Sequence, residues 1–220
     1  MQLINEVGHI FLSTREGLWI LDTGAPTSFG ATESIELSGQ LFKLDRSYMG
    51  LNSELLSSYI GKETLGIIGA DILNQFDVIF DIPNGQVDFV KEEVLCSGAT
   101  LFIKEFMSIP IIEIKINGQF ERMFFDTGAQ ISYWQSKAIE EFPRLELKND
   151  FFPMIGSFDV QTYRVACSLA GIEYSIQFGS LPGLLDMMLK VGGVTGIIGN
   201  EIMGNRKVVY SPRTSKLVLL

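Results

Sequence analysis

Two aspartates carry the pattern with the clearest chemical meaning. Asp22 and Asp126 each begin the tripeptide Asp-Thr-Gly, directly after an apolar run that is typical of a buried strand. A serine follows six positions later in both copies, at Ser28 and Ser132. Two carboxyl groups that share one site cannot both ionise cheaply, so such a pair holds one proton and can serve as acid and base together.

A second phrase repeats in step with the first. Residues 66–69 and 196–199 both read Gly-Ile-Ile-Gly. After it, residues 78–89 and 208–219 each contain two apolar runs around a turn, a pattern that predicts a closing hairpin. This internal repeat predicts two similar halves of about 100 residues that share an interface.

These residues resemble the aspartic peptidases, the family of the pepsin-like enzymes and the retropepsins. One Asp-Thr-Gly is a weak signal, but two copies, each followed by Ile-Ile-Gly, are a specific one. The resemblance covers nearly the whole chain, which looks like two retropepsin subunits fused in tandem. It implies an all-β acid-protease fold with two pseudo-symmetric six-stranded β-barrel lobes, short helices and a cleft between the lobes. The expected lobes are residues 1–98 and 99–220.

The resemblance also implies the roles of the repeated residues. Asp22 and Asp126 would be the catalytic dyad that activates a water molecule for attack on a peptide bond. Each threonine of the repeat would hydrogen-bond the opposite loop, and each glycine would allow the two loops to approach closely. The residues expected to support the dyad in this way are Thr23, Gly24, Thr127 and Gly128.

Alanine follows each Asp-Thr-Gly, at Ala25 and Ala129, where pepsin-like enzymes carry a serine or threonine that donates to the carboxylate. Retropepsins also have alanine here. Without that donor the pKa values of the dyad should be higher, so we expect activity nearer about pH 5 to 7 than pH 2. We also expect both alanines to line the substrate site.

The second half contains an insertion that the first half lacks. Leu169 lies 43 positions after Asp126 (169 − 126), whereas the similar Leu37 lies 15 after Asp22 (37 − 22), a difference of 28 residues. Within it, residues 153–160 suggest two extended arms around a glycine turn, which resembles the retropepsin flap.

We therefore expect one flap, near residues 151–165, that closes over bound peptide. The first half has no room for such a hairpin between Ser28 and Ser34. An ordinary surface hairpin at residues 150–166 is the alternative. The flap residues expected to contact substrate are Ile155, Gly156, Ser157 and Phe158.

Local signals predict several other elements. Strands are expected at residues 2–4, 9–13, 18–21, 109–116 and 120–125, and residues 91–105 are expected to cross between the lobes. Asn52-Ser53 suggests the N-cap of a helix over residues 54–60 that Gly61 ends. A second helix is expected over residues 184–190, ended by Gly192-Gly193.

Composition limits the partners. The chain is 46% hydrophobic, as expected of a globular protein with a substantial core, and its net charge of −9 argues against nucleic acid and anionic membranes. It has no apolar run long enough to span a bilayer and its start lacks a basic segment of a signal peptide, so we expect a cytoplasmic protein. Cys96 and Cys167 are expected to be reduced thiols, with one disulfide as the alternative.

Other chemistries have little support. His9 is the only histidine, so catalysis by a serine or cysteine with histidine would depend on it alone, and metal-ligand spacing is absent. We expect no metal and no cofactor, a polypeptide substrate, and a monomer with internal pseudo-twofold symmetry that is active as made. The main rival function is a peptide-binding module on the same fold without turnover. A domain that works only when further oligomerised is the third alternative.

Overall fold

The computed structural model describes residues 1–153 and 155–220, most of them in β-strands with a few short helices. Met154, which the expected flap turn includes, lies outside the described residues. The first part of the chain forms β1 (Gln2–Glu6), β2 (His9–Ser13), β3 (Leu18–Leu21), β4 (Phe29–Gly30), β5 (Ser34–Leu37), β6 (Gln40–Lys43), β7 (Ser47–Tyr48), β8 (Leu51–Asn52), α1 (Ser53–Ile60), β9 (Gly66–Ile68), α2 (Ala70–Leu73), β10 (Asp77–Asp81) and β11 (Gln86–Val90).

The later part begins with the strands β12 (Ala99–Phe102), β13 (Lys104–Phe106), β14 (Ile109–Ile116), β15 (Gln119–Phe125) and β16 (Ser132–Trp134). A 3₁₀ turn, η1 (Lys137–Glu141), leads to the longest strands, β17 (Arg144–Phe152), β18 (Gly156–Leu169) and β19 (Ile172–Gly179). The chain ends with α3 (Gly183–Gly192), β20 (Gly196–Ile198), η2 (Asn200–Met203), β21 (Lys207–Ser211), η3 (Pro212–Thr214) and β22 (Lys216–Leu219). Among the described helices, none combines the length and the apolar character that a bilayer crossing requires.

The helix boundaries follow the local chemistry of the sequence. The Asn52 side chain accepts a hydrogen bond from the Leu55 amide at the start of α1, and Gly61 ends the helix in the left-handed conformation at φ 73°. Gly193 ends α3 in the same way, at φ 63°. Both helices therefore lie where capping residues predicted them, with the ends shifted by one or two positions.

The strands around the two Asp-Thr-Gly segments pair in matching ways. In the first half, β3 pairs in parallel with β9, and β9 pairs with β4 on its other side. In the second half, β15 pairs in parallel with β20, and β20 pairs with β16. Each Asp-Thr-Gly thus leaves the end of a strand that lies beside a Gly-Ile-Ile strand.

The closing strands of the chain cross into the sheet of the first half. Strand β21 pairs with β10, and β22 lies between β21 and β12, which gives a sheet of ten strands beside one of eight. The ion pair of Arg213 with the fully buried Asp77 fastens this junction at 2.9 Å. The sheets therefore do not divide into the six strands per lobe that the resemblance implies, because β12, β21 and β22 extend the first sheet.

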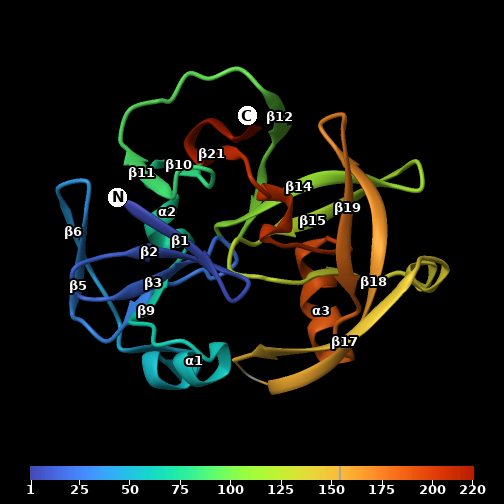
Figure 1. The fold of residues 1–220 in the computed structure, drawn as a ribbon, viewed down its shortest axis with the longest axis horizontal. Helices are drawn as coiled ribbons and strands as arrows, with labels where there is room; N and C mark the ends of the chain where they lie inside the picture. Colours follow the sequence, from blue (N-terminus) through green and yellow to red (C-terminus); the bar gives the residue numbers. More distant parts are fainter. Residues whose placement is uncertain (154) are drawn as a thin grey trace.

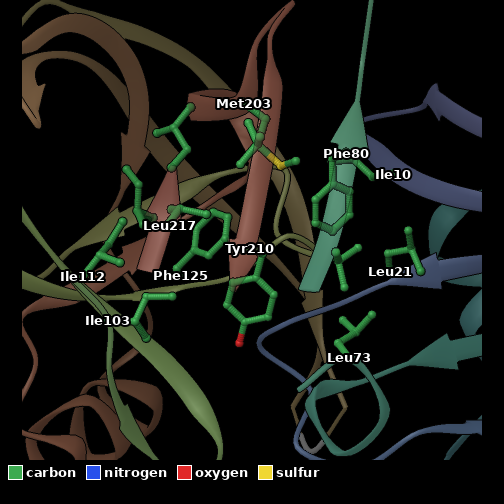
Figure 2. Packing of buried hydrophobic residues seen from close by; sticks show 14 of the residues in the cluster. Ile10, Leu21, Leu73, Phe80, Ile103, Ile112, Phe125, Met203, Tyr210 and Leu217 are labelled. Atoms are coloured by element: carbon green, nitrogen blue, oxygen red, sulfur yellow. The ribbon is translucent and has the colours of Figure 1, made fainter. Parts of the chain in front are cut away.

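The main core is continuous across both halves of the chain. One buried cluster contains Leu21 and Phe80 from the first half together with Phe125 and Tyr210 from the second. Figure 2 shows Tyr210 between Phe125 and the side chains of the first half, and its hydroxyl donates to Asn74 Oδ1 at 2.6 Å. The strands that lead to the two aspartates are therefore anchored in the same core.

The expected insertion is a long hairpin of β17 and β18. Figure 1 shows it running along the lower edge of the molecule from the second half toward α1 of the first half. Its arms are longer than expected, since β17 begins at Arg144 and β18 continues to Leu169. In the first half, residues 29–36 contain β4 and part of β5, which pair with different strands, β9 and β6.

Candidate functional site

The two aspartates occupy equivalent loops. Asp22 follows β3, and its amide donates to the Ile68 carbonyl of the neighbouring strand at 3.0 Å. Asp126 follows β15, and its amide donates to the Ile198 carbonyl at the same distance. Each aspartate directly follows the last residue of a buried strand. The sheet therefore holds the start of each loop and positions both side chains.

The two carboxyl groups lie within hydrogen-bonding range of each other, although 104 positions separate them in the chain. Their loops approach closely at the glycines. A Cβ atom added to Gly24 would overlap the Asp126 carboxyl group, and one added to Gly128 would overlap that of Asp22. Glycine is therefore required at both positions for steric reasons, and both aspartates remain partly exposed to solvent.

The two threonines connect the loops reciprocally. Thr23 Oγ1 donates to the Phe125 carbonyl at 2.7 Å and accepts from the Thr127 amide at 3.0 Å. Thr127 Oγ1 donates to the Leu21 carbonyl and accepts from the Thr23 amide at the same two distances. All four hydrogen bonds are buried, so each loop fixes the main chain of the other.

Main-chain amides orient each carboxylate. Asp22 Oδ1 accepts from the amides of Gly24 and Ala25 at 2.8 and 2.9 Å. Asp126 Oδ1 accepts from the amides of Gly128 and Ala129 at 2.9 and 3.1 Å. With both Oδ1 atoms held in this way, each carboxyl group keeps its Oδ2 atom for its neighbour or for a bound molecule.

The electrostatic environment favours the protonated form of this pair. Burial raises the pKa of Asp22, against the lowering effect of its hydrogen bonds with Asp126 and with the two amides. Burial and the nearby charge of Asp22 raise the pKa of Asp126 well above its ordinary value. Because like charges disfavour double ionisation, the pair can hold one proton at a pH where isolated aspartates are fully ionised.

Ser28 and Ser132 also have equivalent positions, which sequence reasoning noted only as a spacing. Ser28 Oγ accepts from the Gly69 amide at 2.8 Å, and Ser132 Oγ accepts from the Gly199 amide at 2.9 Å. Ser28 alone also donates to a carboxylate, that of Asp71, at 2.5 Å. Their equal distance from the aspartates in sequence was the signal that could have identified this role.

His9 is a site residue that sequence reasoning missed. It lies at the start of β2, is buried, and hydrogen-bonds through Nδ1 to the Gly128 carbonyl at 2.8 Å. The neighbouring Gly8 carbonyl accepts from Asn200 Nδ2, which also donates to the Thr127 carbonyl. The turn between β1 and β2 is thus attached to the loop that carries Asp126.

The β17–β18 hairpin reaches the first half at its tip. The Phe151 ring stacks on Tyr59 of α1, with ring centroids 4.7 Å apart and planes 14° apart. Gly156 has φ +80°, and a Cβ there would lie 3.7 Å from the Tyr59 hydroxyl. This contact closes the hairpin across the molecule.

The other expected flap residues have separate environments. Ser157 is exposed, and its hydroxyl donates to Asn149 Oδ1 at 2.6 Å. Ile155 and Phe158 pack against an apolar cluster of the second half that includes Ile111 and Phe124. Ala25, which we expect to line the substrate site, packs against a corresponding apolar cluster of the first half around Phe11 and Phe29.

Among the described residues, no group of acidic residues, histidines and cysteines has the geometry of a metal site, and both cysteines are free thiols. The cysteine prediction is therefore confirmed, whereas the lone His9 has contacts that its sequence context did not indicate. The dyad, its threonine links and its glycines are brought together, and Ala129 lies beside Asp126.

A scan of protein-family models and a search of curated proteins found no match for this chain.

Proposed function

We propose that this chain is an aspartic endopeptidase that hydrolyses peptide bonds with a water molecule activated by Asp22 and Asp126. The observation that carries the proposal is the contact between two partly exposed carboxyl groups at the ends of equivalent strands. A like-charge pair is costly to maintain, and a structural role would be served better by neutral side chains. The resemblance to the aspartic peptidases points to the same chemistry.

In this mechanism the dyad holds one proton. The ionised carboxylate takes a proton from the bound water, which attacks the scissile carbonyl carbon. The protonated carboxyl group donates to the carbonyl oxygen as that oxygen gains negative charge. The amides of Gly24, Ala25, Gly128 and Ala129 hold the carboxylates in place.

The surroundings suit an extended peptide. We propose that the two halves act as pseudo-symmetric barrel-like lobes, at residues 1–98 and 99–220, with the substrate between them and the β17–β18 hairpin as a flap. Partly buried residues on the two apolar clusters, Ala25 in the first half and Phe158 in the second, would contact side chains on the two sides of the cut. The contact of Phe151 with Tyr59 means that the flap must lift before peptide enters. A cytoplasmic monomer is the proposed working form.

The test is cleavage of a diverse peptide library between about pH 3 and 8, with and without pepstatin. We expect cleavage that pepstatin inhibits and that Asp22→Asn and Asp126→Asn each abolish. Asp71→Asn is the matched control, because it makes the same change next to the site while leaving the dyad intact. Cleavage that survives either dyad substitution would assign the chemistry to other residues.

The rival is a peptide-binding module on the same fold. It predicts that peptides bind with measurable affinity but remain intact at every pH in that range. Mass spectrometry of the recovered peptides, after binding has been measured by fluorescence anisotropy, separates the two functions.

A further inference from the structure

A small pocket of about 150 Å³ lies beside the flap, between the two halves of the chain. We call it the His9–Asp150 pocket. Its polar lining includes His9 from β2, Gln130 from the loop after Asp126, and Asp150 and Ser157 from the two arms of the flap hairpin. Its volume equals about five water molecules, enough for one long side chain.

His9 presents a hydrogen-bond acceptor to this pocket. A carbonyl oxygen can only accept, so the bond from Nδ1 to Gly128 places the proton of the neutral ring on Nδ1. Burial lowers the pKa of His9, although the Gly128 bond and the charges of Asp150 and Asp22 act in the opposite direction. Nε2 has no hydrogen-bond partner in the described part of the chain and is not fully buried. Because His9 lines the pocket, this atom is the ring acceptor available to a bound group.

Asp150 contributes a carboxylate without a cation. It accepts hydrogen bonds from the Tyr133 hydroxyl and from the Phe151 amide. No lysine or arginine of the described residues forms an ion pair with it, and none lines the pocket. Burial raises the pKa of Asp150, which is the expected result when a carboxylate loses water without gaining an opposite charge.

We propose that the His9–Asp150 pocket binds a lysine or arginine side chain of the peptide. A basic side chain supplies the donor that His9 Nε2 lacks, and its charge neutralises the half-buried Asp150 carboxylate, which has hydrogen-bond donors but no cation. The site lies next to the dyad, because His9 contacts Gly128, two positions after Asp126. This inference rests on the proposed function and names a side chain for which the substrate is selected.

The flap couples this pocket to closure. Asp150 lies on the same arm as Phe151, whose ring stacks on Tyr59, and both residues line the pocket. A basic side chain bound at Asp150 would therefore hold the flap in the closed position seen in Figure 1. The hairpin that carries Asp150 would therefore both select a basic side chain and retain the bound peptide.

The first experiment measures binding without turnover. The Asp126→Asn chain is mixed with fluorescent peptides in which a single lysine is moved along an apolar sequence, each matched by a peptide with norleucine in its place. Fluorescence anisotropy at neutral pH should show about tenfold tighter binding for lysine at one position, equivalent to about 1.4 kcal/mol. Equal binding at every position, or a preference for norleucine, overturns the proposal.

Two substitutions then locate the preference. Asp150→Asn should reduce the lysine preference to about twofold or less, because the charge is lost while an acceptor for Tyr133 remains. Glu146→Gln is the matched control, since Glu146 is an exposed carboxylate on the same arm of the hairpin and does not line the pocket. The proposal fails if Asp150→Asn leaves the preference intact or if Glu146→Gln removes it equally.

A third variant covers the case in which Asp150→Asn does not fold. Ser157 is exposed at the pocket, so Ser157→Lys places a competing cation there without disturbing the core. It should abolish the lysine preference, whereas Ser157→Thr should retain it. Retained preference in the Ser157→Lys chain would overturn the assignment.

Failure of the two proposals can be told apart. A lysine preference in binding with no cleavage by the natural chain would refute the endopeptidase proposal and support the proposed basic-side-chain pocket. Pepstatin-sensitive cleavage with no preference between lysine and norleucine would refute the pocket proposal and support the endopeptidase.

Discussion

The Oγ1 atom of Thr23 lies 2.7 Å from the carbonyl oxygen of Phe125, the residue immediately before Asp126. Thr23 itself immediately follows Asp22, so one hydroxyl group links the main chains that carry both aspartates. Thr127 makes the equivalent link in the other direction. The relative position of the two carboxyl groups is thus determined by buried hydrogen bonds that do not involve the carboxyl groups themselves.

Thr23→Ala should destabilise the protein and reduce activity. The substitution leaves the Phe125 carbonyl and the Thr127 amide buried without partners, at a cost of about 1–3 kcal/mol for each group. Thr23→Ser keeps the hydroxyl and is the matched control. Urea unfolding should rank the chains natural, serine, alanine in decreasing stability, and equal stability of the serine and alanine variants would contradict this role.

Asp126→Asn should stabilise the folded protein at neutral pH while it abolishes cleavage. Burial and the Asp22 charge raise the pKa of Asp126, so the folded state binds its proton more tightly than the unfolded state does. For such a group, stability is greatest below the ordinary pKa of about 4 and falls as pH rises toward the folded pKa. Asparagine cannot ionise, so the Asp126→Asn chain does not lose stability in this way as pH rises.

Thermal unfolding of the natural and Asp126→Asn chains at several pH values checks the sign of this effect on stability. The difference in melting temperature should favour Asp126→Asn at pH 7 and shrink or reverse below about pH 4. A variant that is less stable than the natural chain at pH 7 would show that the ionised Asp126 carboxylate stabilises the folded state.

Cleavage should be fastest in weakly acidic to neutral solution. Burial raises the pKa values of both dyad aspartates, so the singly protonated pair persists to higher pH than separate aspartates would allow. Ala25→Ser adds a hydroxyl near Asp22 that can donate to its carboxylate and should move the pH profile of kcat/KM toward acid. A rate maximum of the natural chain below about pH 3 would be inconsistent with these shifts.

Tyr59→Ala should loosen the flap. The substitution removes the ring on which Phe151 stacks, a contact of about 0.5–1.5 kcal/mol beyond its buried area. Hydrogen exchange in residues 150–158 should accelerate, and KM for peptides should rise. Tyr59→Phe retains the stacked ring and serves as the control, so equal exchange rates in the alanine and phenylalanine variants would exclude this closing contact.

Local chemistry made part of the fold predictable. Asn52 and Gly61 are capping residues, so the ends of α1 could be predicted within about two positions. The strand over residues 18–21 is an apolar run that Asp-Thr-Gly ends, and it is found with those bounds. The contact between Asp22 and Asp126 was foreseeable because a repeated segment predicts equivalent positions.

Contacts between distant single residues could not be predicted. Nothing near His9 in the sequence indicates that its ring reaches Gly128, 119 positions later. The bond from Tyr133 to Asp150 likewise depends on where the hairpin folds back, and the insertion has no counterpart in the first half. The pairing of β10 with β21 was also missed, because each hairpin looks complete in sequence.

The pairing of β10 with β21 determines what happens to an incomplete polypeptide. A fragment that stops before β21 would expose the margin of β10 to solvent, where Val78 and Phe80 are completely covered in the intact chain. Exposed margins of this kind recruit strands from other molecules, so an interrupted translation product should aggregate or be degraded instead of persisting as a stable half. The intact polypeptide should accordingly melt in a single cooperative transition, and selection must act on it as one unit despite its duplicated pattern.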